Sequence, residues 1–260
     1  MTSTPAGRTA ADGSPYPDRA GPGFEREVRR MFAHIAGGYE WFDHVASVGQ
    51  DFLWRPRALW ALDRFRRLPV DRVLDVGSGT GELARQIAQH FPRARVVATD
   101  FTRPMLERAR RHPRPPSRPP MSFGCATVAR LPFRPGSFDL AASAFVARNL
   151  SDLPGALREL RRVLRPGGVL LTLEITEPTS AAWRGLFHAY FDTVVPALGR
   201  AVGSEGPYRY LPESLRSLPS RADFQELLRA AGFSRVAAPT QSGGIVTTFL
   251  AEADGSDQSR

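Results

Sequence analysis

A short apolar strand that runs directly into a glycine-rich loop constrains this chain more than any other feature. Arg72–Val76 is the apolar segment, and glycines follow it at every second position, at Gly77, Gly79 and Gly81. Glycine permits positive φ and carries no Cβ, so a ligand can lie against the loop backbone. A helix expected over Glu82–His90 then starts at the loop. The pattern predicts a ligand-binding edge of an α/β sheet.

The alternation of strand and helix continues along the chain. Further strands are expected at Arg95–Thr99, Met121–Cys125, Phe138–Ala144, Val169–Ile175, Arg235–Ala238 and Ile245–Ala251. Helices are expected at Met105–Arg111, Ala156–Leu164, Ala181–Val202 and Ala222–Ala231, with Pro166-Gly167-Gly168 ending the second of these. This order predicts an α/β fold with a doubly wound, mostly parallel, seven-stranded sheet.

Composition divides the chain into a single domain with two tails. Residues 1–23 are rich in Gly, Pro, Ser, Ala and Arg and are expected to be disordered, as is the polar segment 253–260. The domain is expected to span 24–252, with a helical substrate cap over 24–68 and the α/β core over 69–252. No apolar run is long enough for a transmembrane helix.

The glycine spacing distinguishes between nucleotide-type cofactors. Asp100 ends the second expected strand, where an acid can accept hydrogen bonds from ribose hydroxyls. A dinucleotide site has Gly-x-Gly-x-x-Gly, whereas Gly77, Gly79 and Gly81 form Gly-x-Gly-x-Gly. This spacing favours S-adenosylmethionine, which has no pyrophosphate. The alternative is a tight turn without a ligand, and Asp75 can equally serve only to tie the loop backbone together.

Other blocks of the sequence are more particular than the loop. They are Ser47-Val48-Gly49-Gln50-Asp51, Phe145-Val146-Ala147-Arg148-Asn149-Leu150, Arg162-Val163-Leu164-Arg165-Pro166-Gly167-Gly168, Tyr208-Arg209-Tyr210-Leu211 and Gly243-Gly244-Ile245-Val246. With these blocks the chain resembles the ubiquinone/menaquinone biosynthesis C-methyltransferases over about residues 25–251. The resemblance implies a Rossmann-like class I methyltransferase fold, S-adenosyl-L-methionine as cofactor and a prenylated quinol as substrate.

The resemblance also implies site residues. Cofactor binding is expected at Asp75, Gly77, Gly79, Thr80, Gly81, Asp100, Phe101, Thr127, Val128 and Ala144. Substrate binding is expected at Tyr39, Asp51 and Tyr210, although each of these can equally be a core or capping residue. No cluster of Cys, His and Asp suggests a metal.

Three segments depart from the family pattern. The family has Asp-Ala-Glu where this chain has Thr127, Val128 and Ala129, so the acid near the adenine amino group is missing and Thr127 offers only a hydroxyl. Ala144 replaces a serine, and Val146-Ala147 replaces Gly-Leu. These changes bear on cofactor affinity and on the identity of the substrate.

Methyl transfer to a ring carbon needs a phenol that loses its proton and a group that stabilises the phenolate. Arg148 and Asn149 follow the fourth expected strand, at the edge where α/β sheets bind ligands, and are the expected catalytic pair. His34 and His44 are candidate bases, but a lone histidine in a helical segment is more often a packing or capping residue. The aromatic run Trp183–Phe191 lines either a prenyl channel or the core.

The charge of the chain has two interpretations. The formal net charge is +9, and all 35 basic residues are arginine, so GC-rich codon usage can account for the excess. The alternative is an anionic partner. No zinc-finger spacing or aromatic RNA-binding signature is present, so we expect no specific nucleic acid. A prenylated quinol lies in the bilayer, so arginine-rich helices would help the enzyme at the membrane surface.

The sequence also predicts a cellular location and a reaction, and alternatives to the reaction stay open. A single cysteine, Cys125, suggests a cytoplasmic protein, in contact with the inner face of the membrane if the quinol is the substrate. The expected reaction is methylation of demethylmenaquinol to menaquinol. The alternatives are a methyltransferase for another small aromatic or lipid-like substrate and a weakly cofactor-binding assembly partner without catalysis. The oligomeric state is open, with a homodimer as one option.

Overall fold

A computed structural model describes residues 23–35, 47, 49–112, 121–201 and 205–255 of the chain. The expected N-terminal tail, apart from Gly23, and most of the C-terminal tail lie outside these residues. So do two positions of the expected cap, Tyr39 and His44. The last strand runs to Ala253, one residue beyond the end of the expected domain.

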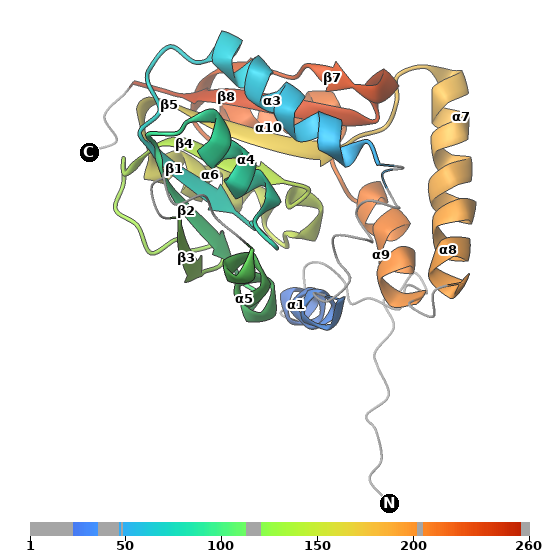
Figure 1. The fold of residues 1–260 in the computed structure, drawn as a ribbon. Coiled ribbons are helices and arrows are strands. Elements are labelled where there is room, and N and C mark those ends of the chain that lie inside the picture. The colour runs from blue at the N-terminus through green and yellow to red at the C-terminus, as the bar shows by residue number, and fades with distance from the viewer. Residues whose placement is uncertain (1–22, 36–46, 48, 113–120, 202–204, 256–260) are drawn as a thin grey trace, which may run out of the picture.

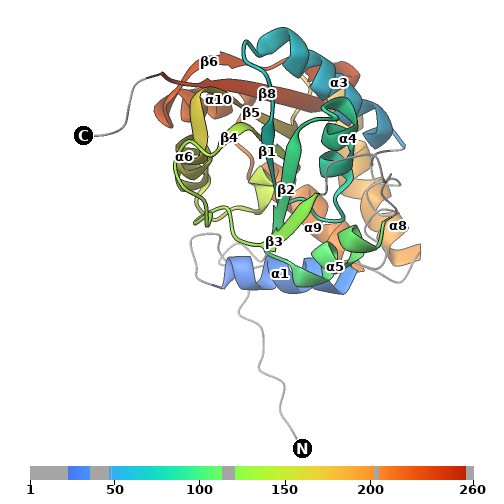
Figure 2. The ribbon, with the colours of Figure 1, turned by 60° about the vertical axis from the view of Figure 1, so that its left-hand side comes forward.

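One mixed sheet forms the centre of the molecule (Figures 1 and 2). Its order is β3-β2-β1-β4-β5-β8-β6, and a two-residue strand, β7, pairs with β8. The strands are β1 (Arg72–Val76), β2 (Arg95–Asp100), β3 (Ser122–Cys125), β4 (Phe138–Ala144), β5 (Leu164–Ile175), β6 (Phe233–Ala237), β7 (Thr240–Gln241) and β8 (Val246–Ala253). The first five strands of this order are parallel, and β8 is antiparallel to β5 and β6. The mostly parallel, doubly wound prediction is confirmed, and β7 is added to the seven strands expected.

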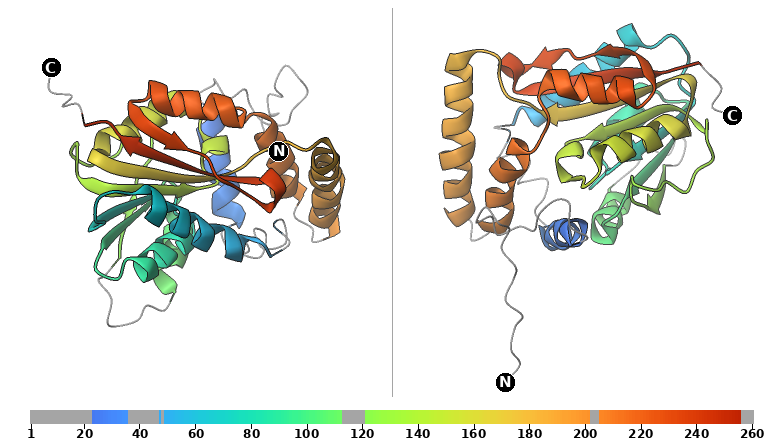
Figure 3. Two further views of the ribbon diagram at one scale, coloured as in Figure 1. Left: turned by 90° about the horizontal axis from the view of Figure 1, so that it is seen from above. Right: turned by 180° about the vertical axis from the view of Figure 1, so that it is seen from behind.

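Helices cover both faces of the sheet (Figure 3). The α-helices of the described residues are α1 (Phe24–Ile35), α3 (Asp51–Phe65), α4 (Glu82–His90), α5 (Arg103–Arg111), α6 (Leu153–Val163), α7 (Ala181–Ala189), α8 (Val195–Ala201), α9 (Glu205–Arg216) and α10 (Arg221–Ala230). Successive strand residues point to opposite faces, so Val73 packs with α3 and α4 whereas Leu74 packs with α6 and α10. Both faces of the parallel strands are therefore buried, which explains their almost continuous apolar composition.

Helix α6 stops just before Pro166-Gly167-Gly168, as expected, but these residues lie inside the next strand rather than before it. Helix α6 ends at Val163, and β5 already begins at Leu164, which pairs with Phe138 of β4. The register between β4 and β5 shifts before the next pair, so the Pro-Gly-Gly residues form a bulge inside the strand. Gly167 has a φ of +74°, which suits this bulge.

A helical layer stands at the carboxyl edge of the parallel strands (Figure 1). It contains α1, α9 and a long segment in which a π-helical turn, Tyr190–Val194, joins α7 to α8. Helix α9 was not among the expected elements, because Gly206, Pro207 and Pro212 read as helix breakers. A proline in the first turn needs no amide partner, and tertiary packing accommodates the second. This layer covers the edge where the glycine loop lies.

Candidate functional site

The glycine loop takes the shape that its sequence predicts. Gly77, Gly79 and Gly81 all have positive φ, at +65°, +53° and +84°. The Gly79 amide donates a hydrogen bond of 2.9 Å to Asp100 Oδ2, and the Thr102 amide donates one of 2.7 Å to Oδ1. Asp100 thus joins the loop to the end of β2, and its carboxylate retains acceptor positions for a further ligand.

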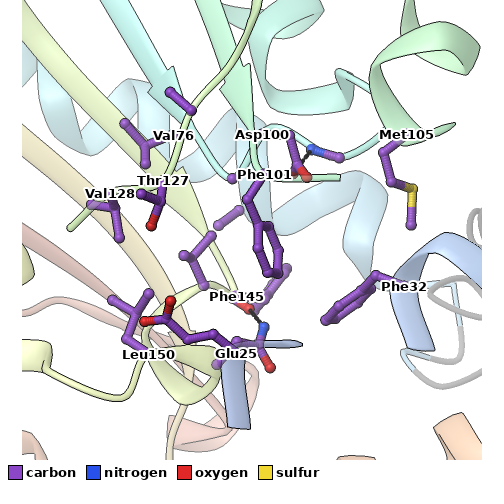
Figure 4. Close-up of a pocket in the computed structure, with 16 residues that line it drawn as sticks. Glu25, Phe32, Val76, Asp100, Phe101, Met105, Thr127, Val128, Phe145 and Leu150 are labelled. Atoms are coloured by element: carbon purple, nitrogen blue, oxygen red, sulfur yellow. Dashed lines mark hydrogen bonds between the residues drawn. The ribbon is translucent and has the colours of Figure 1, made fainter. Parts of the chain in front are cut away.

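One pocket combines most of the predicted cofactor residues with groups from the cap (Figure 4). The glycine loop and Asp100 form one side of it. The other lining residues are Glu25, Phe32, Val76, Phe101, Met105, Ala126, Thr127, Val128, Ala144, Phe145, Val146, Asn149 and Leu150. Figure 4 shows that Phe32 and Glu25 come from α1, whereas Phe101 and Met105 follow the end of β2. We call the part lined by Gly77, Gly79 and Asp100 the strand-edge half of the pocket. The part lined by Asn149, Leu150 and the α1 residues is the cap half.

A second, smaller pocket continues the first. It shares Gly77, Gly79, Ala144 and Phe145 with the first pocket, and it also contains Asp75, Ser78, Thr80, Arg55, Glu82 and Leu83. Burial raises the pKa of Asp75 to about 8, against the opposing charge of Arg55. A cationic ligand here would favour the ionised carboxylate.

Buried charge continues around Arg55. Its Nη1 lies 2.9 Å from Glu82 Oε2 and 3.6 Å from Asp51 Oδ2. Asp51 also accepts a hydrogen bond of 2.8 Å from Ser47 Oγ, and it lines neither pocket. The predicted substrate residue Asp51 therefore lies in the first turn of α3, where it contacts Arg55 but does not reach the second pocket that Arg55 lines.

The residues after β4 form a strained turn. Phe145 has a φ of +61°, a conformation that is uncommon for a bulky side chain and is associated with functional sites. The 3-10 turn Ala147–Asn149 (η1) follows it and turns successive side chains by about 120°. Asn149 consequently faces the first pocket, whereas Arg148 does not line it and is buried.

Glu174, which the sequence analysis missed, holds this turn in place. It is fully buried in β5, and its Oε1 accepts hydrogen bonds from the amides of Val146 (3.1 Å) and Ala147 (2.9 Å). Burial raises its pKa to about 7, against those amides and the positive charge of Arg148. An acidic residue inside an otherwise apolar strand was the signal available in the sequence.

A tyrosine from the helical layer at the carboxyl edge fixes the orientation of Asn149. The hydroxyl of Tyr210 in α9 donates a hydrogen bond of 2.8 Å to Asn149 Oδ1. Asn149 Nδ2 donates one of 3.2 Å to the carbonyl of Phe145. Tyr210 is otherwise packed with Phe24 and Val28 of α1. The structure thus brings Tyr210 to the predicted catalytic pair without placing it in the pocket lining.

Two further predicted residues have defined positions. Gly81 lies at the start of α4 and lines neither pocket, and a Cβ there would contact Ala109 of α5 at 3.3 Å. Thr80 is buried in the second pocket.

Val146, one of the departures noted above, lies so close to Gly77 that a Cβ on the glycine would be 2.5 Å from Val146 Cγ2. The valine therefore closes the space above the loop.

Solved structures share this architecture. A putative methyltransferase from Haloferax volcanii, in complex with its Trm112 activator, matches with a TM-score of 0.59 at 19% identity, over 86% of this chain and 97% of that one. A possible histamine N-methyltransferase from Thermotoga maritima matches with a TM-score of 0.58 at 19% identity, over 86% of this chain and 99% of that one. At this identity the likeness shows the fold alone.

Curated proteins are similar at a higher level of identity. A demethylmenaquinone methyltransferase from Thermus thermophilus is 40% identical over 206 residues, 78% of this chain and 91% of that protein. A ubiquinone/menaquinone biosynthesis C-methyltransferase from Syntrophotalea carbinolica is 35% identical over 224 residues, 86% of this chain and 93% of that protein. The model of the ubiE/COQ5 methyltransferase family matches residues 23–252, so this chain, with its glycine loop and Asp100 at one continuous pocket, belongs to that family.

Proposed function

We propose that the protein transfers a methyl group from S-adenosyl-L-methionine to a ring carbon of a prenylated quinol, with demethylmenaquinol as the substrate. The observation that carries this proposal is the first pocket, in which the glycine loop and Asp100 share one space with Asn149, Phe145 and Leu150. The cofactor and the acceptor can therefore bind next to each other in one continuous pocket. The activities named for the relatives described above agree with this chemistry.

The residues present fit the cofactor. Asp100 retains acceptor positions for ribose hydroxyls, and Phe101 with Val128 offers apolar walls for a purine. Asp75 lies buried in the adjoining pocket with neither carboxylate oxygen hydrogen-bonded, which suits a positively charged group such as an amino acid ammonium. Bound there, the cofactor supplies an electrophilic methyl group. Thr127 contributes a hydroxyl to the same lining.

On the acceptor side, Asn149 is the residue best placed to act on the quinol. Its Oδ1 accepts from Tyr210, so the amide is held with Nδ2 on the other side. One of the two N–H groups of Nδ2 donates to the Phe145 carbonyl. The other N–H is available to a phenolate oxygen or to a water that receives the phenol proton. A stabilised phenolate makes the neighbouring ring carbon more nucleophilic. The fixed amide thus favours proton loss from the substrate.

Arg148 has a less direct role in this proposal. Its guanidinium is buried and does not line the pocket, and its charge acts on Glu174. We assign it a positioning role, because it keeps positive charge beside the turn that carries Asn149. Arg148→Ala should then lower kcat. Normal turnover by this variant, with unchanged cofactor binding, would remove Arg148 from the mechanism.

The proposed substrate also places the protein at a membrane. A quinol with a prenyl tail partitions into the bilayer, so the enzyme has to meet it at the cytoplasmic surface. None of the helices that the structure describes combines the length and apolar character needed to cross a bilayer. Contact with the surface is therefore part of the proposal.

A second candidate function is methylation of another small aromatic substrate. The observation that favours it is Val146, whose methyl groups occupy the space above Gly77 that a smaller residue would leave open. A narrower pocket can change which ring substituents are accepted. Ala144 and Thr127, also departures from the family pattern, line the same pocket.

One assay separates these possibilities. Purified protein is incubated with cofactor and either demethylmenaquinol or a panel of other phenols, and the mass and methylation position of each product are determined. Carbon methylation of demethylmenaquinol is the expected result. Methylation of another phenol alone would support the second candidate. Calorimetry with S-adenosylmethionine tests the non-catalytic alternative, because a scaffold protein would bind the cofactor weakly or fail to bind it.

A further inference from the structure

Large exposed apolar side chains gather on two helical segments of the molecule. Across the part of the chain that the structure describes, they are Phe52, Leu53, Trp60, Leu68, Trp183, Leu186 and Val194. All belong to α3, to the three residues after it, or to α7 and its π-helical continuation. Single exposed apolar residues are ordinary, but a concentration of this kind marks an interaction surface.

Helix α3 carries large apolar side chains on both of its faces. Its inner face, with Ala58, Leu59 and Leu62, is buried in the core. On its outer face Phe52 is 61% exposed and Trp60 is 62% exposed. A helix that lies on the surface and is apolar on its outer side has a partner there.

Arginines alternate with these apolar residues along the outer face of α3. Leu53, Arg57, Trp60 and Arg64 are all exposed and follow one another at helical spacing, so they form one stripe. Neither arginine forms an ion pair with another described residue. Asp63, the acid nearest to them, is engaged by Arg66 and His90. A stripe of arginine, leucine and tryptophan is typical of helices that lie in a membrane interface.

The outer side of α7 is largely apolar, because Arg184, which is also exposed, donates hydrogen bonds back to the carbonyls of Pro178 and Thr179. Ala182, Trp183, Leu186 and Ala189 are exposed there. The other charged residues of the segment lie on the other side, in a chain of contacts. His188 Nε2 is 3.0 Å from Glu177 and its Nδ1 is 3.6 Å from Asp192, which receives a hydrogen bond from Arg216.

Helices α3 and α7 both contact the loop Ser242–Gly244, and α3 does so through Trp54, a buried residue of its inner face. Trp54 Nε1, on α3, donates a hydrogen bond of 2.8 Å to Ser242 Oγ. A Cβ at Gly243 would lie 3.5 Å from the ring of Trp183 on α7. Figures 1 and 3 show this loop between the two helices. We refer to the outer faces of α3 and α7 together as the α3–α7 surface.

We propose that the α3–α7 surface rests on an anionic lipid bilayer, with Trp60 and Trp183 at the interface and Arg57 and Arg64 at the lipid phosphates. A second copy of the chain is the other partner that an apolar surface can take. A symmetric dimer would bring the arginine stripe against itself, and repulsion opposes that arrangement. Anionic headgroups instead supply the missing negative charge, and the chain as a whole carries +9.

This inference rests on the proposed function, because a prenylated quinol gives the enzyme a reason to sit on a bilayer. Arg55 of the same helix lines the second pocket, so the helix that carries the arginine stripe also borders the site. Docking would thus hold this wall of the site close to the substrate's own phase.

The test is flotation of the full chain with vesicles of equal parts phosphatidylglycerol and phosphatidylcholine, and with vesicles of phosphatidylcholine alone. Wild-type protein should float with the anionic vesicles in a salt-sensitive manner. The double variant Arg57→Gln/Arg64→Gln should bind them roughly thirty-fold more weakly, as expected for two arginines near a membrane surface. Trp60→Ser/Trp183→Ser should also bind more weakly.

The matched control is Arg111→Gln/Arg158→Gln, which removes the same charge from α5 and α6, helices without exposed large apolar residues. It should float like wild type. Equal losses in this control and in Arg57→Gln/Arg64→Gln, or no flotation of the wild type, would overturn the proposal. So would a wild-type dimer that Trp60→Ser/Trp183→Ser dissociates in sedimentation, because the surface would then join two copies. Thermal unfolding verifies that each variant is folded.

A second measurement separates this inference from the proposed function. Turnover is measured with a quinol whose prenyl tail is shortened until it is water-soluble. Arg57→Gln/Arg64→Gln should methylate this acceptor at the wild-type rate and lose activity only with a vesicle-bound long-chain quinol. Loss of activity with both acceptors would count against the surface. If wild-type protein floats with anionic vesicles but methylates neither quinol, the proposed function fails and the docking surface stands.

Discussion

The two halves of the main pocket are built in different ways. The strand-edge half comes from one stretch of chain, in which Gly77, Gly79 and Asp100 follow two adjacent strands, and each contact is local to the β1–β2 edge. The cap half comes from segments far apart in the sequence, because Asn149 meets Tyr210 of α9 and both lie near α1. The first half is a continuous sequence motif, and the second exists only when the helical layer is folded.

The difference suggests how function is divided. On the proposed function, the strand-edge half holds the cofactor and the cap half meets the acceptor. Variants in the first half should therefore change cofactor affinity, and variants in the second should change turnover of the acceptor.

Gly77→Ala should break the strand-edge half most severely. The new Cβ would lie 2.5 Å from Val146 Cγ2, on a residue whose φ is +65°. Overpacking costs about 1–3 kcal/mol and the left-handed conformation about 1–2 kcal/mol, so cofactor binding should be lost and the midpoint of unfolding lowered. Calorimetry and thermal denaturation measure the two effects. Val146→Gly in the same chain should restore part of the stability, and an absence of rescue would mean that backbone strain alone is responsible.

Asp100→Ala should weaken the same half without unfolding it. The variant loses two charge-assisted hydrogen bonds, from the Gly79 and Thr102 amides, and the acceptor for the ribose. The expected loss of about 1.5–3 kcal/mol corresponds to roughly 10–100-fold weaker binding of S-adenosylmethionine in calorimetry. Asp100→Asn, which keeps one acceptor oxygen, should lie between this variant and wild type. Unchanged affinity in Asp100→Ala would separate the acid from the cofactor.

Glu174→Gln should change how stability depends on pH. Burial raises the pKa of Glu174 from 4.5 to about 7, so the folded protein binds this proton more tightly than the unfolded chain does. The resulting stabilisation is complete below the pKa of an unfolded glutamate and is lost as pH rises through about 7. In Glu174→Gln the fall in the free energy of unfolding over this window should be smaller by about 1–3 kcal/mol. Denaturant titrations at several pH values would show it, and a parallel fall in both proteins would contradict it.

Tyr210→Phe should produce the smallest effect and the sharpest test of the cap half. It removes only the hydroxyl that orients Asn149, a hydrogen bond of about 0.5–1.5 kcal/mol. We expect a several-fold lower kcat with an unchanged cofactor affinity. Tyr208→Phe, the same change in the same helix but in the cluster with Phe187, is the control. A loss of cofactor affinity in Tyr210→Phe would show that the two halves are coupled.

Much of the sheet could be predicted from the sequence, because its elements are set by local patterns. The bounds of β1, β4 and α4 agree with the expected ones residue for residue. Prediction failed where a local signal had two interpretations. The strand β5 begins at Leu164 and not at the expected Val169, because Pro166–Gly168 form a bulge inside it, and the prolines of α9 concealed a helix that tertiary packing supports.

In the candidate site, too, local patterns predicted some features and missed others. Gly77, Gly79, Asp100, Phe101 and Thr127 all line the main pocket, and their cofactor-binding roles stay predictions. The roles of Arg148, Asp51 and Tyr210 remain predictions, and none of the three lines the main pocket. Glu174 could have been suspected from its place in an apolar strand, but nothing local indicated that it accepts the amides of the turn after β4.

By itself the sequence determined the fold class, the cofactor loop and the family, because glycine φ preferences and strand-helix alternation act over a few residues. Only the tertiary structure decided which of two adjacent residues, Arg148 or Asn149, faces the pocket, since a 3-10 turn sends them in different directions. It also decided that Val146 closes the space above Gly77 and that α3 and α7 contact the same loop. These are contacts between segments distant in the chain, and no local pattern encodes them.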